Sequence, residues 1–296
     1  GNLSVAKCDC VEYGCGMKRE IGKEWRDADL THLSVSQLNR TPAYWIYAYL
    51  YLRDDRKNIT VGENAAVGTA VHNGLQSIVC HGQDITDQIL AAQIAFDFHD
   101  ANHDDVKREK YRDCIPDMIR NGIDILTEYG FTGAVDEERI ETWLDGVNVP
   151  LIGFVDLLVP DTMFCEIKTK APRKTKLLKD GTQGWAKATL PKAPEKSHVA
   201  QAAIYNYALN VTPSICYVTD HDAVIFTPFN CDELKADALA YAVEDMRQKA
   251  LIRQNLLRVS TDPKVLASFT DPDWGHMYQW KIETEYLEKA KKLWKL

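Results

Sequence analysis

The sequence predicts an α/β fold in which helices flank a central β-sheet, with an N-terminal extension and C-terminal helices. Helical periodicity dominates residues 34–129 and 196–257, whereas residues 137–169 alternate or run apolar as strands do. A second pair of strand-like runs lies at 214–229. The apolar content of 45% in 296 residues is enough to bury a sizeable core.

Capping residues and a proline indicate where the first helices begin. Residues 1–30 are polar and lack a sustained period, so we expect them to form an extension wrapped on the surface. Ser34 or Ser36 can cap a helix over 34–52, and Pro42 marks its start or a kink. Further helices are expected at 63–80, 86–101, 105–129, 196–209, 231–257 and 281–296.

The strand-like runs form a β-meander followed by a separate hairpin. Runs at 137–145 and 148–159 precede the turn Pro160-Asp161-Thr162, which leads to a third strand at 163–170. The basic stretch 171–195 contains three prolines and two glycines, and we therefore expect a long loop there.

Charge and composition limit the classes of function. The net charge of −8 argues against a protein that coats nucleic acid, because phosphate binding depends on Lys and Arg. Residues 168–196, however, carry nine basic and two acidic side chains, which indicates a confined polyanion site. The sequence shows neither an apolar run of the ~20 residues that a membrane span needs nor a signal core, so we expect a cytoplasmic protein of a bacterial or infected host cell. Its eight scattered cysteines are expected to be reduced thiols.

The strand pair around the turn carries the clearest chemical pattern. Glu166 and Lys168 lie two apart on a strand and share a face. If Pro160-Asp161-Thr162 is the turn, Val159 faces Met163, and Asp156 falls opposite Glu166. Facing carboxylates repel each other unless a positive charge lies between them, and oxygen ligands beside a lysine indicate Mg²⁺ or Mn²⁺.

Two alternatives compete with this interpretation. Asp161 also precedes Glu166, but it would lie at the hairpin tip. Because a strand rises ~3.3 Å per residue, that tip is several residues and many ångströms away from Glu166. The acids could instead belong to an exposed strand face held by salt bridges, which is their ordinary environment. Asp156 interrupts the apolar run LIGFVDLLV, and a buried carboxylate needs a partner, so we favour the metal site.

Four blocks of the sequence, in order, resemble the RecB-like branch of the PD-(D/E)XK nuclease superfamily. They are Ser34-Val-Ser-Gln-Leu with Pro42 and Trp45; Gly68-Thr-Ala-Val-His72; Gly153-Phe-Val-Asp156 with Glu166-Ile-Lys168-Thr169; and Gln201-Ala-Ala-Ile-Tyr205. The resemblance covers roughly residues 33–230. It implies a restriction-endonuclease-like core with a mixed β-sheet, and one nuclease domain over 31–296 that contains the basic loop and a C-terminal helical part, 231–296.

The resemblance also assigns roles within the site. It implies that His72, Asp156, Glu166 and the main-chain carbonyl of Ile167 bind the metal, and that Lys168 orients or helps to deprotonate the attacking water. A divalent ion activates water and polarises phosphate, which fits that assignment. Histidine is an unusual ligand for Mg²⁺, so Mn²⁺ is expected to bind well too.

Further residues are expected around the metal. Gln201 and Tyr205 share a helical face, and the resemblance places such a pair at the site, although ordinary helix packing would also explain them. We expect some residues of and after the catalytic strand to contact DNA phosphates and others to form a wall along which single-stranded DNA binds. The alternative is a solvated, lysine-rich loop with no specific role. The candidate residues are Thr169, Lys170, Arg173, Lys174, Lys176 and Trp185.

The sequence departs from many relatives at the positions of an iron-sulfur cluster. Thr41 stands where they carry a cysteine before the first-block proline, and the segment 272–280 has none, so no cluster is expected. The aromatic tail is expected to pack into that space. Cys8, Cys10 and Cys15 could bind zinc with a fourth ligand, but their spacing is not the usual one.

The pattern as a whole indicates a DNA exonuclease acting on single-stranded or duplex ends, as in phage replication or recombination. That end dependence comes from the resemblance alone. A structure-selective flap endonuclease and a non-catalytic DNA-binding assembly subunit are the alternatives, and a homo-oligomer is possible.

Overall fold

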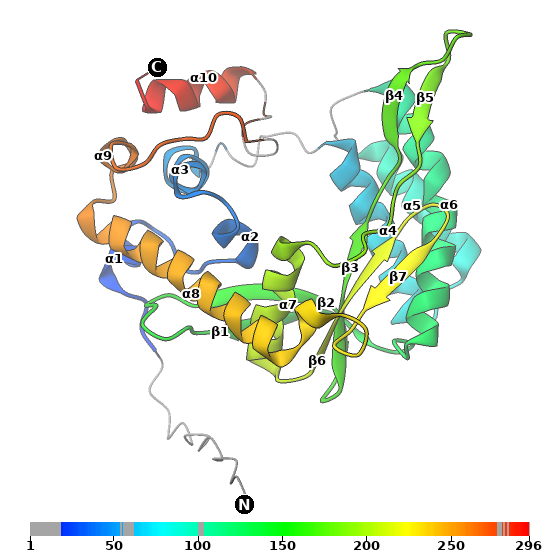
Figure 1. The fold of residues 1–296 in the computed structure, drawn as a ribbon, viewed down its shortest axis with the longest axis horizontal. Helices are drawn as coiled ribbons and strands as arrows, with labels where there is room; N and C mark the ends of the chain where they lie inside the picture. The colour runs from blue at the N-terminus through cyan, green and yellow to red at the C-terminus, as the bar shows by residue number, and fades with distance from the viewer. Residues whose placement is uncertain are drawn as a thin grey trace, which may run out of the picture.

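A five-stranded mixed β-sheet forms the centre of the protein (Figure 1). The computed structural model describes residues 19–53, 55, 62–99, 104–276, 280, 282 and 284–295. The sheet has the order β1-β2-β3-β6-β7, and only β3 and β6 pair in parallel. Its strands are β1 (Val135–Thr142), β2 (Leu151–Val159), β3 (Met163–Thr169), β6 (Thr212–Val218) and β7 (Ala223–Phe226). This confirms the predicted α/β class with a central mixed sheet.

Helices cover both faces of the sheet, each over its own apolar core. On one face lie α4 (Glu63–Val79), α5 (Ile85–Phe98) and α6 (Asp105–Glu128), which pack on Leu157 and Ile167. On the other lie α7 (Lys196–Leu209) and α8 (Ala236–Val259), which share a core with Val155 and Ile215 (Figure 1). The predicted helices at 63–80, 86–101, 105–129 and 196–209 are therefore confirmed within a few residues at each end.

The N-terminal part of the chain is more broken, and more deeply buried, than expected. It contains α1 (Lys23–Asp27), α2 (Val35–Leu38), α3 (Pro42–Trp45) and a π-helix, η1 (Ile46–Tyr51). Ser34 caps α2 and Thr41 caps α3, so two capping side chains divide the single helix that the sequence predicts over 34–52. Trp25 and Ala28 are buried and anchor residues 19–30 to the core, whereas residues 1–18 of the expected extension lie outside the described part.

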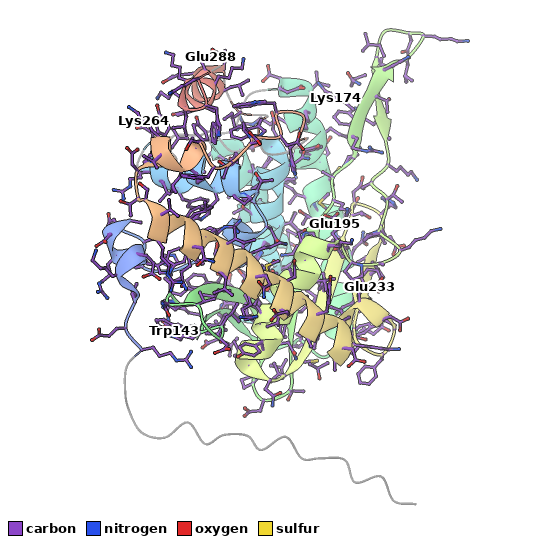
Figure 2. The ribbon with its side chains drawn as sticks, turned by 60° about the vertical axis from the view of Figure 1, so that its left-hand side comes forward. Trp143, Lys174, Glu195, Glu233, Lys264 and Glu288 are labelled. Atoms are coloured by element: carbon purple, nitrogen blue, oxygen red, sulfur yellow. The ribbon has the colours of Figure 1, made fainter. Side chains whose placement is uncertain are left out.

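The stretch 171–195 is a β-hairpin arm for much of its length, which corrects the expected long loop. Strands β4 (Arg173–Leu177) and β5 (Gln183–Ala186) pair antiparallel and project from the body (Figure 1). Gly181 makes the tight turn with φ of 84°, and Asp180 accepts from the backbone of Thr182. The glycine that suggested a loop is the turn of the hairpin. Figure 2 shows Lys174 along this arm.

The C-terminal segment packs its aromatic side chains against the first helices. The expected helix at 231–257 begins later, because residues Asp232–Leu234 form a 3₁₀ turn before α8. After α8 come α9 (Pro263–Ala267), which was not predicted, and α10 (Thr284–Leu293). The ring centroid of Trp280 lies 5.2 Å from that of Tyr44 and 5.6 Å from that of Tyr47, so this part of the tail packs on α3 and η1. Within the described ranges, no helix is both long and apolar enough to cross a membrane.

A buried arginine ties α8 to the end of α2. Arg253 is 1% exposed and donates to the main-chain carbonyls of Gln37 (3.4 Å) and Leu38 (3.2 Å), and also to that of Arg40. These carbonyls belong to the C-terminal end of α2, where helical partners run out. Burial lowers the pKa of Arg253 to about 10, so it remains charged at neutral pH. The guanidinium therefore fixes the position of residues 37–40.

Replacing this arginine tests its role in stability. Arg253→Met would leave several buried carbonyls without donors, and we expect the free energy of unfolding to fall by about 2–4 kcal/mol. Denaturant titration measures the change. Lys249→Met, which removes only a surface pair with Asp245 on the same helix, should cost less than about 0.5 kcal/mol; equal effects of the two changes would contradict this assignment.

Candidate metal centre and active site

The β2–β3 hairpin has the register that the sequence predicts. Val159 pairs with Met163 and Leu157 with Cys165, around a turn in which Asp161 has a φ of 58°. Asp161 is exposed at this turn, whereas Asp156 is buried. The next step of the same register brings Asp156 beside Glu166, and one Asp156 carboxylate oxygen accepts from the Ile167 amide at 2.7 Å. The carboxylate thus occupies the place where the two strands begin to separate.

The neighbouring strand pair twists sharply at the same level. Val155 and Leu157 belong to different cores, although side chains two apart on a regular strand share a face. Across from them, Glu137 of β1 has a left-handed φ of 50°, between the pairs Asp136–Leu157 and Glu138–Val155. Non-glycine residues with such backbones are strained and often lie at functional sites. This local rotation presents the Glu137 carboxylate next to Asp156.

Three potential metal ligands converge from three elements. The donor atoms of His72 (α4), Glu137 (β1) and Asp156 (β2) all lie within 4.8 Å of one another. Nε2 of His72 is 3.3 Å from Glu137 and 3.8 Å from Asp156. The sequence placed His72 and Asp156 here but missed Glu137, because alternation along a strand does not reveal a left-handed residue.

Gln76 connects two members of this cluster. It lies one turn after His72 on α4 and is 5% exposed. Its side-chain amide donates to the Glu137 carboxylate (3.2 Å) and to the Asp156 carbonyl (2.9 Å). Gln76 was not predicted either, although its spacing of four from His72 on a helix was a usable signal.

Glu166 is the most deeply buried acid of the site. Its side chain is 0% exposed, and burial and the nearby charge of Asp156 raise its pKa to about 8. One oxygen accepts from Nζ of Lys168 at 3.0 Å, whereas the other has no hydrogen-bond partner among the described residues. Nε2 of His72 likewise makes no hydrogen bond there. Buried polar atoms without partners are costly, so these two atoms fit a site built for a cation.

A hydrogen-bonded chain extends from Glu166 through the lysine to α7. Nζ of Lys168 also donates to Gln201 (3.1 Å), whose amide donates to the Tyr205 hydroxyl (3.1 Å). Burial opposes the charge on Lys168, but Glu166 and Asp156 outweigh it and raise the pKa of this lysine. A Cβ on Gly153 would lie 2.5 Å from the Tyr205 ring, so only glycine allows this close approach. The structure thus brings Gln201 and Tyr205 to Lys168.

The expected DNA contacts are spread along the strand and the arm. Lys170 pairs with Glu195 (2.7 Å) and Lys174 with Asp104 (2.5 Å), whereas Arg173 and Lys176 are exposed on the arm. Thr169 lies close to α4, where a Cβ on Gly68 would approach its hydroxyl to 3.0 Å. Trp185 is half-buried, and its ring packs 6.3 Å from that of Tyr111 at the edge of the core.

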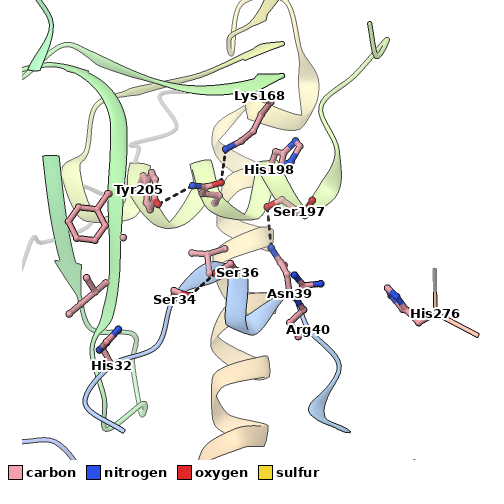
Figure 3. Close-up of a pocket in the computed structure, with 15 residues that line it drawn as sticks. His32, Ser34, Ser36, Asn39, Arg40, Lys168, Ser197, His198, Tyr205 and His276 are labelled. Atoms are coloured by element: carbon pink, nitrogen blue, oxygen red, sulfur yellow. Dashed lines mark hydrogen bonds between the residues drawn. The ribbon is translucent and has the colours of Figure 1, made fainter. Parts of the chain in front are cut away.

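Two hollows meet at the lysine. One, of about 510 Å³, is lined by His72, Ile167, Lys168 and Thr169 among others. The other is a cleft of about 690 Å³ between α2, β2 and α7, and Lys168 and His198 line both (Figure 3). Nδ1 of His198 lies 2.6 Å from the Tyr217 hydroxyl, and burial lowers its pKa to about 4, which keeps this imidazole neutral.

The cysteines add no second centre in the described part of the chain. Cys80, Cys114, Cys165, Cys216 and Cys231 are free thiols, and burial raises the pKa of Cys114 to about 12. Thiols with raised pKa values are poor nucleophiles and poor metal ligands. Cys8, Cys10 and Cys15, which the sequence suggested as possible zinc ligands, lie outside the described residues.

Comparisons with known proteins give only distant likenesses. No protein-family model matches the sequence, and no curated protein matches it. Among solved structures, the chain is similar to a "putative exonuclease" from Eubacterium rectale, with 13% identity, a TM-score of 0.47, and coverage of 79% of this chain and 84% of that chain. It is also similar to the protein SSO0001, with 15% identity, a TM-score of 0.30 and coverage of 63% and 85%. At these values, the function has to be inferred from the site itself.

The position of Glu137 leads to a test of the metal centre. Glu137→Gln keeps the shape of the side chain but removes its charge, and we expect the Kd for Mn²⁺ to rise by about tenfold or more. Isothermal titration calorimetry measures this Kd. Glu138→Gln is the matched control, because this adjacent acid is exposed and is not one of the three converging ligands. Equal Kd values for Glu137→Gln and the unmodified protein would show that Glu137 is not a ligand.

The raised pKa of Glu166 predicts a pH dependence of metal binding. In the metal-free protein this carboxyl is protonated below about pH 8, and a cation must displace that proton. Mn²⁺ affinity should therefore rise with pH, by up to about tenfold per unit, and level off above about pH 8. Calorimetric titrations with Mn²⁺ in buffers that differ in ionisation enthalpy measure how many protons are released when the metal binds. Affinity that is constant between pH 6 and 8 would contradict the prediction.

Proposed function

We propose that this protein is a metal-dependent deoxyribonuclease that hydrolyses phosphodiester bonds. One observation carries the proposal: His72, Glu137 and Asp156 converge beside the buried Glu166–Lys168 pair, where two buried polar atoms make no hydrogen bond within the described chain. Carboxylates, an imidazole and a lysine in one pocket suit hydrolysis of phosphate esters. The resemblance of four sequence blocks to RecB-like nucleases, on which the sequence prediction rests, supports the same class.

The residues divide into those that would hold the metal and those that act on the substrate. His72, Asp156, Glu166 and the Ile167 carbonyl would hold Mg²⁺ or Mn²⁺, with Glu137 as a further ligand. When bound, the ion supplies an activated water and offsets the negative charge of the phosphate. The imidazole of His72 favours Mn²⁺ as a good alternative to Mg²⁺.

Lys168 is the group best placed to act on the reacting oxygens. Its ammonium is held by Glu166 and Gln201 at 3.0 and 3.1 Å, so its position is fixed before substrate binds. A fixed positive charge at this point orients the attacking water and stabilises charge that develops on the phosphate oxygens. Tyr205 acts one step away, since it accepts from Gln201 and so helps to fix that amide.

The exposed basic side chains of the arm would guide the DNA substrate to the site. Arg173 and Lys176 are exposed on β4, which follows β3 directly along the chain. Cations on such an element attract the DNA backbone without reading its sequence. Action at DNA ends, a role in phage or recombination DNA metabolism, a cytoplasmic location and assembly into a homo-oligomer remain parts of the proposal that rest on the sequence.

Substitution of the site residues tests the reaction. Asp156→Asn, Glu166→Gln and Lys168→Met should each lower cleavage by at least about 100-fold in Mg²⁺ or Mn²⁺, because each removes a charge from the reacting centre. The assay follows end-labelled linear and closed circular DNA, single- and double-stranded, with EDTA as a blank. Asp161→Asn, an acid of the exposed turn, is the control and should cleave as the unmodified protein does.

The substrates in this assay also separate the alternatives. An exonuclease degrades linear DNA and spares closed circles, whereas an endonuclease cuts both. If the unmodified protein binds DNA but cuts none of these substrates with either metal, the chain is a binding subunit and the proposal fails. Full activity of Asp156→Asn would also refute the ligand set.

A further inference from the structure

His198 lies beside the proposed catalytic lysine. It belongs to the first turn of α7 and lines the same hollow of about 510 Å³ as His72 and Lys168. Spacings of three and seven residues place it on the helical face that carries Gln201 and Tyr205. Gln201 accepts from Lys168 on this face, and Figure 3 shows His198 next to that lysine.

A buried tyrosine holds one nitrogen of this imidazole. Tyr217 of β6 is fully buried and pairs with Lys168 in the register of the sheet. Its hydroxyl oxygen accepts from the Glu195 amide at 3.0 Å and lies 2.6 Å from Nδ1 of His198. Burial raises the pKa of Tyr217 to about 12, so this hydroxyl keeps its proton.

The proton of this hydroxyl determines the tautomer of His198. Within the described part of the chain, Nδ1 of His198 is the one acceptor that hydrogen-bonds to the Tyr217 hydroxyl, since the Glu195 amide is itself a donor. A buried O–H without an acceptor costs free energy, so Tyr217 donates to Nδ1. Nδ1 is then unprotonated, and the single proton of the neutral ring lies on Nε2.

The other nitrogen of the ring is an open hydrogen-bond donor. Nε2 of His198 makes no hydrogen bond to any described residue, and it is not one of their buried atoms without a partner, so it is accessible from the hollow. Lys168 adds an ammonium and Thr169 a hydroxyl to the lining of the same hollow. Several donors around one hollow suit a ligand with several acceptor oxygens, such as a phosphate group.

We propose that His198 binds the DNA substrate through its Nε2–H, which donates to a non-bridging phosphate oxygen in the hollow beside Lys168. The inference rests on the proposed nuclease function and adds to it a substrate-binding residue and the tyrosine that selects its tautomer. Burial and the charge of Lys168 lower the pKa of His198 to about 4, which makes the ring too weak a base for proton transfer at neutral pH. His198 is therefore a binding group, and Lys168 remains the group that acts on the reacting oxygens.

Two substitutions at His198 test this hydrogen bond. His198→Leu removes the donor, and we expect kcat/KM for a linear oligonucleotide in Mn²⁺ to fall by about tenfold or more, the usual loss for a hydrogen bond to a charged group. His198→Gln keeps a neutral N–H donor and should stay within about threefold of the unmodified protein. Because His198 is not a proposed ligand, the Kd of His198→Leu for Mn²⁺ should not change.

A histidine outside the site is the matched control. His221 pairs with Asp220 in the turn between β6 and β7 and lines neither hollow beside Lys168. His221→Leu should therefore cleave as the unmodified protein does.

Methylphosphonate scanning identifies the phosphate that His198 contacts. Each single-stranded oligonucleotide carries one methylphosphonate, in which a methyl group replaces a non-bridging oxygen. Binding is measured by fluorescence anisotropy in EDTA, so that the strand stays intact. At one position the methyl group should weaken binding to the unmodified protein at least about threefold more than binding to His198→Leu, which has already lost that contact.

The tautomer is measurable without DNA or metal. In protein with isotope-labelled histidine, long-range proton–nitrogen NMR spectra distinguish a protonated from an unprotonated ring nitrogen. The signals of His198 are those that His198→Gln lacks. We expect the proton on Nε2 at neutral pH, and Tyr217→Phe, which lacks the hydroxyl, should populate both tautomers.

The outcomes separate this inference from the nuclease proposal. If His198→Leu cleaves like the unmodified protein, loses no more activity than His198→Gln, or loses its Mn²⁺ affinity together with its activity, the inference is refuted while the nuclease stands. A proton on Nδ1, or methylphosphonate effects that are equal in both proteins at every position, would refute it too. If the unmodified protein cuts no DNA with either metal, the proposed function fails and this inference fails with it.

Discussion

The site is organised around two acids, Asp156 and Glu166, that are buried side by side on neighbouring strands. Two carboxylates in an apolar interior repel each other and lose their hydration, which is costly without compensation. The chain compensates partly: Lys168 binds Glu166, and the Ile167 amide binds Asp156. One oxygen of Glu166 keeps no partner in the described structure. The remaining negative potential is what makes the pocket suited to a divalent cation.

The surrounding elements serve to hold this arrangement rigid. Gln76 restrains Glu137 and the Asp156 backbone from the helical side, and Gln201 restrains Lys168 from α7. Glycines at 68 and 153 allow close approaches, to Thr169 and Tyr205. Most of the matching blocks in the sequence therefore have a physical role in the folded protein: they supply ligands, the partners of ligands, or the space that those partners need.

Sequence patterns predicted what depends on regular geometry and missed what depends on distortion. The β2–β3 register follows from a period of two and one turn, so the pairing of Val159 with Met163 and the choice of Asp156 over Asp161 as the buried acid could be made in advance. Glu137 could not, because its left-handed backbone and the twist of β2 interrupt that period. The arm was taken for a loop since its glycines and prolines suggest turns, and the burial of Trp25 depends on partners more than 200 residues away, such as Gln254.

The tie between Arg253 and the end of α2 has a consequence for synthesis of the protein. Every proposed ligand, the lysine and Gln201 precede Arg253 in the sequence, so a ribosome exposes them before the residue that anchors the 37–40 wall of the cleft. A nascent chain can therefore contain the acids of the site while one wall of the cleft still lacks its anchor. The wall of the cleft formed by residues 37–40 is therefore anchored only once α8 has been synthesised, when every proposed ligand is already part of the nascent chain.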